Sequence, residues 1–431
     1  MGLYTRPEKI ATSSTHTQDS TAPLIVITAL FFMWGLLTSL NDVLIPHLKE
    51  VYTLSYSQVM LVQLCFFGAY LLASLPAGML IKRIGYQRGV VVGLTIAALG
   101  CAIFYPAASG GYSLFLLALF TLACGITVLQ VAANPYVTAL GNPRTASSRL
   151  TLTQAFNALG TTMAPAIGGI LILGAHVAEP AAIAAMSAGE QAAYRAHQAA
   201  TVQGPYLVLA GTLLVVAVVF ALIRLPKLKQ TNDLPLKATE EVVPLRKQAH
   251  LVLGVLGIFA YVGAEVSIGS FLINFLGEPH IGALAAAQAA HYVSYYWGGA
   301  MVGRFVGFMV MRSVSPGKAL AFNACGTVLL VAIAMFSQGA PAMVAIIAVG
   351  LFNSIMFPTI FSMALHGLGS RTGQASGLLC MAIAGGAVVP YAQGFLADSI
   401  GVQHSFLVPA LCYVFVLFYG IRFARMYQPK I

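Results

Sequence analysis

The feature that most constrains this chain is a series of apolar runs, most of them 20 residues or longer, separated by short polar segments. A helix rises about 1.5 Å per residue, so a run of this length crosses the roughly 30 Å hydrocarbon core of a bilayer. Only 8% of the 431 residues are charged, whereas soluble domains average about 25%. The sequence therefore predicts an all-α membrane protein with twelve transmembrane helices, at about 23–47, 58–81, 89–108, 113–140, 147–174, 204–225, 249–277, 289–311, 317–338, 341–367, 373–397 and 403–425.

The positions of the basic residues predict how the chain is oriented. If the N-terminus is cytoplasmic, 19 of the 22 Lys and Arg residues fall in cytoplasmic segments, and the exceptions are Lys49, Arg195 and Arg304. Cytoplasmic loops of membrane proteins carry an excess of Lys and Arg, so both termini are expected in the cytoplasm. The net charge of +10 is then explained by orientation, and no nucleic-acid partner is expected.

The chain divides into two halves of six predicted spans each. We expect a cytoplasmic N-terminal tail at 1–22, a six-helix bundle at 23–225, a cytoplasmic linker at 226–248, and a second bundle with a short tail at 249–431. Landmark residues recur between the halves at similar offsets. Pro135 and Pro358 are 223 residues apart, and Gly160 and Gly385 are 225 apart. This repetition predicts duplicated, pseudo-symmetric bundles, as in transporters that bind their substrate near the middle of the membrane.

Two carboxylates lie well inside predicted spans, Asp42 and Glu265. A charged side chain at the centre of a bilayer costs about 2.5–3.5 kcal/mol on insertion scales. Each acid therefore needs an ionic partner, a proton or a bound cation, and any of these is compatible with a role in ion coupling. Arg304, near the cytoplasmic end of its span, is expected to form a structural pairing or to extend its charged group to the membrane surface.

Polar side chains recur at helical spacing in several spans, so they share one face of each helix. Such amides and hydroxyls hold helices together, or they line an aqueous cavity that binds the hydroxyls of a neutral polyol. An organic anion would instead require arginines. The candidate substrate-binding residues are Trp34, Asn41, Gln130, Asn134, Gln154, Asn157, Trp297 and Asn353.

The segment Gly78-x-x-x-Lys82-Arg83-x-Gly85-x-x-Arg88 resembles the loop signature of the major facilitator superfamily, with Lys82 where that signature has Asp. The runs F-F-M-W-G…L-N-D, L-Q-V-A-A-N-P, R-L-T-L-T-Q-A-F-N, Y-V-G-A-E-V-S, Y-W-G-G-A-M-V-G-R and L-F-N-S-I-M-F-P-T-I-F-S together resemble its fucose–proton symporter family, glucose/galactose transporter branch. The resemblance implies the major facilitator fold, a central sugar site and a bacterial inner membrane.

The resemblance also implies roles for the acids. The span 1 acid of the fucose branch matches Asp42, but its span 4 acid matches Gln130, which cannot ionise, whereas Glu265 stands where that branch has Gln. We therefore expect a hexose importer of the glucose/galactose type that works by alternating access. Asp42 would be the coupling acid and a possible Na⁺ ligand, with Glu265 as a second coupling or binding carboxylate. Because the span 4 acid is missing, Na⁺ is favoured slightly over H⁺.

The remaining expectations concern what else the chain binds. No nucleophile motif, phosphate-binding loop or ATPase sequence occurs in it, so an enzyme is not expected, and no cofactor other than the co-transported ion is expected. The expected partners are the hexose, the cation and the lipid bilayer, and we expect a monomer. The alternative is a proton-driven exporter of drugs or metabolites on the same fold.

Overall fold

The computed structural model describes residues 21–51, 56–171, 186–223 and 244–426, with side chains described outside 40–51, 56–64 and a few shorter stretches. These residues form helices and no strand. The first half contains α1 (Thr21–Val51), α2 (Tyr56–Ile84), α3 (Tyr86–Gly110), α4 (Tyr112–Ala139), α5 (Ala146–Leu171) and α7 (Ala188–Leu222). The second half contains α8 (Ala249–Gly277), α9 (Ala286–Val310), α10 (Pro316–Phe336), and then three helix pairs: α11 (Gly339–Asn353) with α12 (Met356–Leu365), α13 (Thr372–Met381) with α14 (Gly385–Ile400), and α15 (Val402–Ser405) with α16 (Leu407–Arg422).

Each of the twelve predicted spans coincides with a helix or a helix pair, and nine stretches of the described residues are long and apolar enough to cross a membrane. One boundary differs clearly from the prediction. Helix α7 begins at Ala188, well before the expected start of the sixth span near residue 204. The Ser187 side chain accepts from the Glu190 amide while the Glu190 carboxylate accepts from the Ser187 amide, and this capping box fixes the earlier start.

The two halves repeat the same close helix contact. Gly160 of α5 packs on the backbone of α1, where an added Cβ would lie 2.3 Å from the Phe32 carbonyl oxygen. Gly385 of α14 packs in the same way on α8, where an added Cβ would lie 2.2 Å from the Phe259 carbonyl oxygen. Glycine lets two membrane helices approach this closely. The recurring contact agrees with the duplication that the sequence offsets predict.

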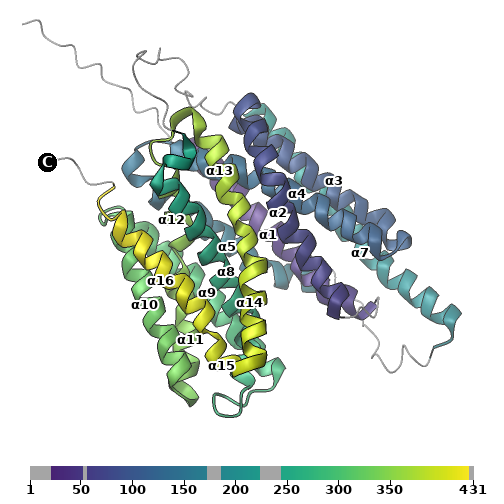
Figure 1. Cartoon of the computed structure of the whole chain (residues 1–431). Coiled ribbons are helices and arrows are strands. Elements are labelled where there is room, and N and C mark those ends of the chain that lie inside the picture. The colour runs from purple at the N-terminus through teal and green to yellow at the C-terminus, as the bar shows by residue number, and fades with distance from the viewer. Residues whose placement is uncertain (1–20, 52–55, 172–185, 224–243, 427–431) are drawn as a thin grey trace, which may run out of the picture.

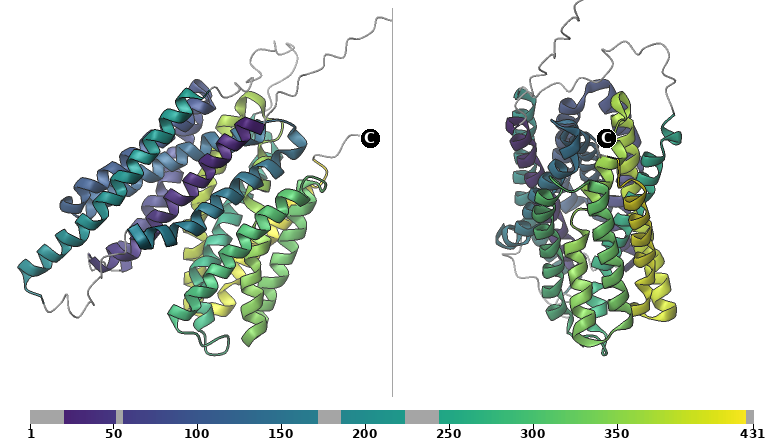
Figure 2. Two further views of the ribbon diagram at one scale, coloured as in Figure 1. Left: turned by 180° about the vertical axis from the view of Figure 1, so that it is seen from behind. Right: turned by 90° about the vertical axis from the view of Figure 1, so that its left-hand side faces the viewer.

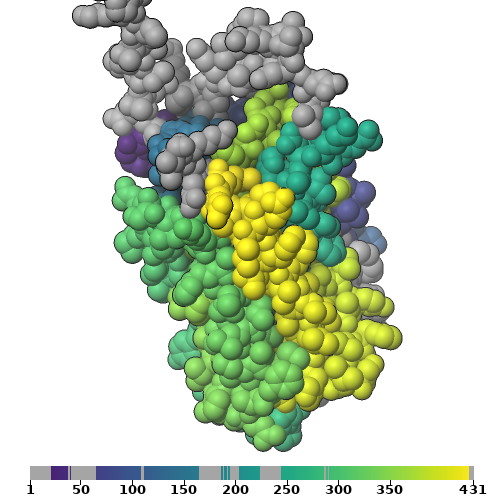
Figure 3. Space-filling view, turned by 60° about the vertical axis from the view of Figure 1, so that its left-hand side comes forward, coloured from purple at the N-terminus to yellow at the C-terminus, as the bar shows by residue number. Residues whose placement is uncertain are grey.

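The outer surface of the bundle is apolar. Large side chains such as Val208 of α7 and Phe322 of α10 are 66% and 71% exposed. In a soluble protein an extended apolar surface of this kind would be a liability, whereas in a bilayer it faces lipid tails. In Figure 3 the second half forms a continuous surface in which α16 lies against α10.

The two halves meet at one end of the molecule and diverge toward the other (Figures 1 and 2). The meeting end carries the start of α1 and the end of α16, and we refer to it as the tail end, with the opposite end as the far end. The contacts between halves run from α2 and α4 to α13, and from α5 to α9 and α12. The structure is therefore closed at the tail end.

Candidate functional site

In the second half, the candidate site is built around a break in the tenth predicted span. Helix α11 ends at Asn353, and α12 starts at Met356 after a two-residue turn. Pro358 lies four residues after Ser354 and has no N–H, so the Ser354 carbonyl lacks its normal helical donor. The Arg304 guanidinium of α9 donates to that carbonyl through Nε at 3.3 Å. The break in the helix thus leaves the Ser354 carbonyl without a helical donor, and Arg304 donates to it instead.

Asn353 ends α11 and is fully buried. Its backbone carbonyl accepts a hydrogen bond from the Tyr261 hydroxyl of α8 at 3.1 Å, and its Nδ2 donates to the Tyr296 hydroxyl of α9 at 2.8 Å. Its Oδ1 is buried with no hydrogen-bond partner among the described residues. Three helices therefore hold Asn353 in a fixed orientation and leave one amide atom available for another partner.

Glu265 of α8 lies in the same cluster, and its side chain is 14% exposed. Its Oε1 is 4.0 Å from an Arg304 nitrogen, and within the described chain that oxygen forms no hydrogen bond. Tyr296 and Tyr413 lie within electrostatic range of the carboxylate. The pairing expected for Arg304 is thus formed, but loosely, so that the acid keeps a buried oxygen without a donor.

In the first half, three amides of the candidate site lie on neighbouring helices. Gln130 and Asn134 are one turn apart on α4, and Gln154 is on α5. All three side chains are less than a tenth exposed. Gln130 Oε1, Gln154 Nε2 and both polar atoms of the Asn134 amide are buried without a hydrogen-bond partner in the described structure. Native proteins pair nearly all such atoms, so unpaired buried amides mark a place for polar ligands or water.

Asn157 has a different position from the other amides. Its Nδ2 donates to the Phe31 carbonyl of α1 at 2.9 Å, and Thr161 on the same face donates to the Gly35 carbonyl at 3.4 Å. Gly35 itself packs directly on the backbone of α5. In this structure Asn157 therefore joins α5 to α1, the helix that contains Asn41 and Asp42.

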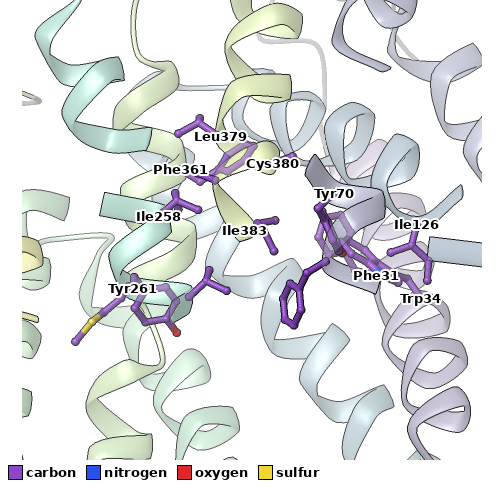
Figure 4. Packing of buried hydrophobic residues seen from close by; sticks show 14 of the residues in the cluster. Phe31, Trp34, Tyr70, Ile126, Ile258, Tyr261, Phe361, Leu379, Cys380 and Ile383 are labelled. Atoms are coloured by element: carbon purple, nitrogen blue, oxygen red, sulfur yellow. The ribbon is translucent and has the colours of Figure 1, made fainter. Parts of the chain in front are cut away.

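The two candidate tryptophans lie in different surroundings. Trp34 is 8% exposed and packs at a tilt against Phe31, with ring centroids 5.2 Å apart (Figure 4). It lines a small apolar pocket between α1, α3, α4 and α7, inside the first half. Trp297 of α9 is 41% exposed and packs edge-on against Tyr296, with ring centroids 5.1 Å apart. The pocket beside Trp34 is thus lined by the first half alone, whereas Trp297 lies partly exposed on the second half.

Two candidate residues, Asn41 and Asp42, belong to α1, but their side chains are outside the described part of the structure. The proposed Na⁺ site at Asp42 is therefore outside it as well. Among the described residues no group of three His, Cys, Asp or Glu side chains is arranged to bind a metal.

Sequence reasoning missed Tyr413 and Ser354. Tyr413 of α16 is fully buried, and its hydroxyl has no hydrogen-bond partner in the described chain. Its sequence context is uniformly apolar, so only packing reveals that it joins the Glu265 cluster. Ser354 contributes a backbone carbonyl, and the signal for that was Pro358 four residues later.

Among the described residues, twelve helical spans form two repeated bundles with buried polar clusters inside each, which is the architecture of a membrane transporter. The chain belongs to the Major Facilitator Superfamily, whose family model matches residues 26–389. It is 55% identical over 412 residues to the glucose/galactose transporter of Brucella abortus, covering 94% of this chain and 96% of that protein. It is 35% identical to the L-fucose-proton symporter of Escherichia coli, covering 93% of this chain and 92% of that protein.

Solved structures show the same fold. The E. coli fucose:proton symporter in its outward conformation matches with a TM-score of 0.86 and 34% identity, over 93% of this chain and 98% of that chain. A proton:xylose symporter matches with a TM-score of 0.66 at 11% identity, over 94% of this chain and 96% of that one, which shows the shared fold alone.

Proposed function

We propose that this chain is a hexose importer that carries its sugar together with a cation by alternating access. The observation that carries the proposal is the set of buried amides with unpaired polar atoms in both halves, Gln130, Asn134 and Gln154 on one side and Asn353 on the other. An amide offers donors and an acceptor, which matches neighbouring sugar hydroxyls. The name of the 55% identical relative, a glucose/galactose transporter, supports glucose and galactose as substrates.

The proposed coupling acids are Asp42 and Glu265. The fucose relatives are named proton symporters, and the loose 4.0 Å contact between Glu265 and Arg304 leaves the acid free to exchange a proton. These observations favour H⁺ over the Na⁺ that the missing span 4 acid suggested. The two bundles, 23–225 and 249–431, would move as units about the 226–248 linker.

The distribution of Lys and Arg supports a cytoplasmic tail end. We propose that the protein lies in a bacterial inner membrane with both termini on its cytoplasmic side. On this orientation the described conformation faces outward. We further propose that the protein works as a monomer, because each chain carries both halves of the site.

Uptake into proteoliposomes tests the proposal, with proton and sodium gradients imposed separately. We expect glucose and galactose to accumulate above equilibrium when the proton gradient points inward, and not with sodium alone. Accumulation driven by neither gradient would contradict symport, and sugar-independent efflux of apolar compounds would instead indicate an exporter.

Variants test the residues. Asn353→Ala should raise the KM for sugar about tenfold or more, because a buried hydrogen bond to a neutral partner contributes about 0.5–1.5 kcal/mol and an unpaired partner costs more. Asn274→Ala is the matched control, since Asn274 is exposed on α8.

Asp42→Asn should abolish accumulation and preserve sugar exchange, and unchanged accumulation would remove Asp42 from the coupling role.

A further inference from the structure

Among the described residues, three hydrogen bonds of serine hydroxyls cross between the two halves at the tail end. The Ser376 hydroxyl of α13 donates to the Val131 carbonyl of α4 at 2.9 Å. The Ser148 hydroxyl of α5 donates to the Phe308 carbonyl of α9 at 2.7 Å. The Ser147 and Ser362 hydroxyls of α5 and α12 are 2.6 Å apart, and Ser362 donates onward to the Thr359 carbonyl. Each of these bonds crosses from one half to the other.

The carbonyls that accept these bonds are available because their helices are locally irregular. Pro135 lies four residues after Val131 and has no N–H, so it leaves the Val131 carbonyl without its helical donor. Phe308 lies at the end of α9, where the Arg312 amide bonds to the Met309 carbonyl and not to Phe308. In both cases a serine from the opposite half supplies a donor that the helix itself does not.

Around Ser376, helices α2 and α13 of the two halves approach each other very closely. An added Cβ on Gly78 of α2 would lie 2.8 Å from the Gly373 carbonyl oxygen, and one on Gly377 would lie 2.7 Å from the Ser74 carbonyl oxygen. The Ser74 hydroxyl is buried at this contact without a hydrogen-bond partner among the described residues. The interface is therefore tight, yet it is not fully satisfied in hydrogen bonds.

Both ion pairs found among the described residues, Arg304 with Glu265 and His280 with Glu278, lie within the second half. Lys82 and Arg83 at the end of α2 are exposed. The contacts described between the halves at this end include neutral hydrogen bonds, each of which contributes about 0.5–1.5 kcal/mol net.

The carbonyl that accepts the hydrogen bond from Ser376 lies on the turn of α4 that carries the candidate amides. Val131 directly follows Gln130 and precedes Asn134 by three residues, and Pro135 is the next residue. We propose that Ser376 is a positioning residue for alternating access. By binding the carbonyl that Pro135 exposes, it holds the tail end closed beside the amide-bearing turn of α4, and this bond breaks when the tail end opens.

Cys380 provides a native reporter for tail-end opening. It lies one turn beyond Ser376 on α13, is fully buried, and lies near Tyr70 of α2 in the opposite half (Figure 4). In a variant of the full chain whose other five cysteines are replaced, a hydrophilic maleimide should modify Cys380 only when the halves separate at this end. The rate of modification then measures the open fraction.

Ser376→Ala should raise the modification rate roughly twofold to tenfold, because it removes one hydrogen bond that joins the halves in the closed form. Because the Ser376 hydroxyl also contacts the Cys380 thiol, each rate is divided by the rate of the same variant in denaturant. The matched control is Ser399→Ala on α14, whose exposed hydroxyl bonds only to the Phe395 carbonyl of its own helix. A Ser376→Ala rate no higher than that of Ser399→Ala would overturn the proposal. Ionic strength should leave the rates unchanged, and a strong acceleration by salt would show that charge closes this end.

A second variant tests the role of the freed carbonyl. Pro135→Ala restores an N–H that can bond to the Val131 carbonyl, so that losing Ser376 no longer leaves this acceptor unpaired. Ser376→Ala should then accelerate modification of Cys380 less than twofold in the Pro135→Ala background. An undiminished acceleration would show that Ser376 acts without the carbonyl. These rates are measured without sugar or gradient, so they stand or fall separately from the proposed hexose symport.

Discussion

At the scale of single residues, the second half brings together buried polar groups that lack some of their hydrogen bonds or have only a distant counter-charge. Arg304 divides its donors between the Ser354 carbonyl at 3.3 Å and the Glu265 carboxylate at 4.0 Å. A backbone carbonyl carries only a partial charge, so Glu265 is the only full counter-charge that the structure brings to Arg304 within the described residues. Removing one member therefore leaves the other charge poorly compensated in an apolar bundle.

This pairing predicts a non-additive pair of substitutions. Arg304→Gln should lower the stability of the detergent-solubilised protein by about 2 kcal/mol or more, because it leaves the Glu265 carboxylate buried and unpaired. The double variant Glu265→Gln/Arg304→Gln should recover a large part of this loss, because it removes both charges. Thermal unfolding of the four proteins measures the interaction. Simple additivity of the two losses would show that the 4.0 Å contact contributes nothing.

At the scale of helices, proline positions decide which backbone carbonyls leave the helical pattern. Pro135 and Pro358 occupy equivalent places in the two halves, and each frees a carbonyl that a side chain from another helix then binds. In α4 the donor is Ser376 of the opposite half, whereas at the break between α11 and α12 it is Arg304 of the same half. Both halves thus contain a carbonyl that a proline leaves without its helical donor, but the side chain that donates to it differs between them.

Pro358→Ala tests the break directly. The new amide N–H can bond to the Ser354 carbonyl and extend the helix across residues 354 and 355, in competition with Arg304. We expect unchanged or higher thermal stability and a transport rate at least tenfold lower, because the broken segment carries Asn353. Pro316→Ala is the matched control, since Pro316 starts α10, where no helical bond is lost or gained. Full transport by Pro358→Ala would show that the break is not needed.

The sequence alone predicts much of these elements, and the reasons for its failures are physical. Long apolar runs locate all twelve spans, since a bilayer leaves few alternatives to a helix. Helix α7 starts earlier because a capping box and an alanine-rich segment form helix outside the apolar run. Amides at helical spacing identify polar faces, but spacing does not show that Asn157 binds α1 whereas Asn134 remains unpaired. Tyr413 carries no sequence signal, because its role comes only from the packing of α16.

At the scale of the whole molecule, one end is closed and the other is open, as in the outward conformation named for the E. coli relative. Alternating access requires that the closed end can open without unfolding either bundle. The tail-end contacts suit this requirement, because they are neutral hydrogen bonds and glycine contacts between otherwise intact helices. The membrane supplies little hydrophobic driving force for holding helices together, so small packing and hydrogen-bond differences decide which end is closed.

A disulfide across the tail end should therefore trap this conformation. The Ser147 and Ser362 hydroxyl oxygens are 2.6 Å apart, close to the roughly 2.05 Å of a sulfur–sulfur bond. In a background without native cysteines, Ser147→Cys/Ser362→Cys should cross-link on mild oxidation, stop transport, and recover it with a reductant. The control pair, Ser147→Cys/Ser399→Cys, places its second thiol at the far end of α14 and should not cross-link. Sugar should still bind the cross-linked protein from the far end, with a Kd within about threefold of the reduced form, because the cross-link keeps the tail end closed as it already is in the described conformation. Loss of sugar binding on cross-linking would show that the described conformation is not the one that receives the substrate.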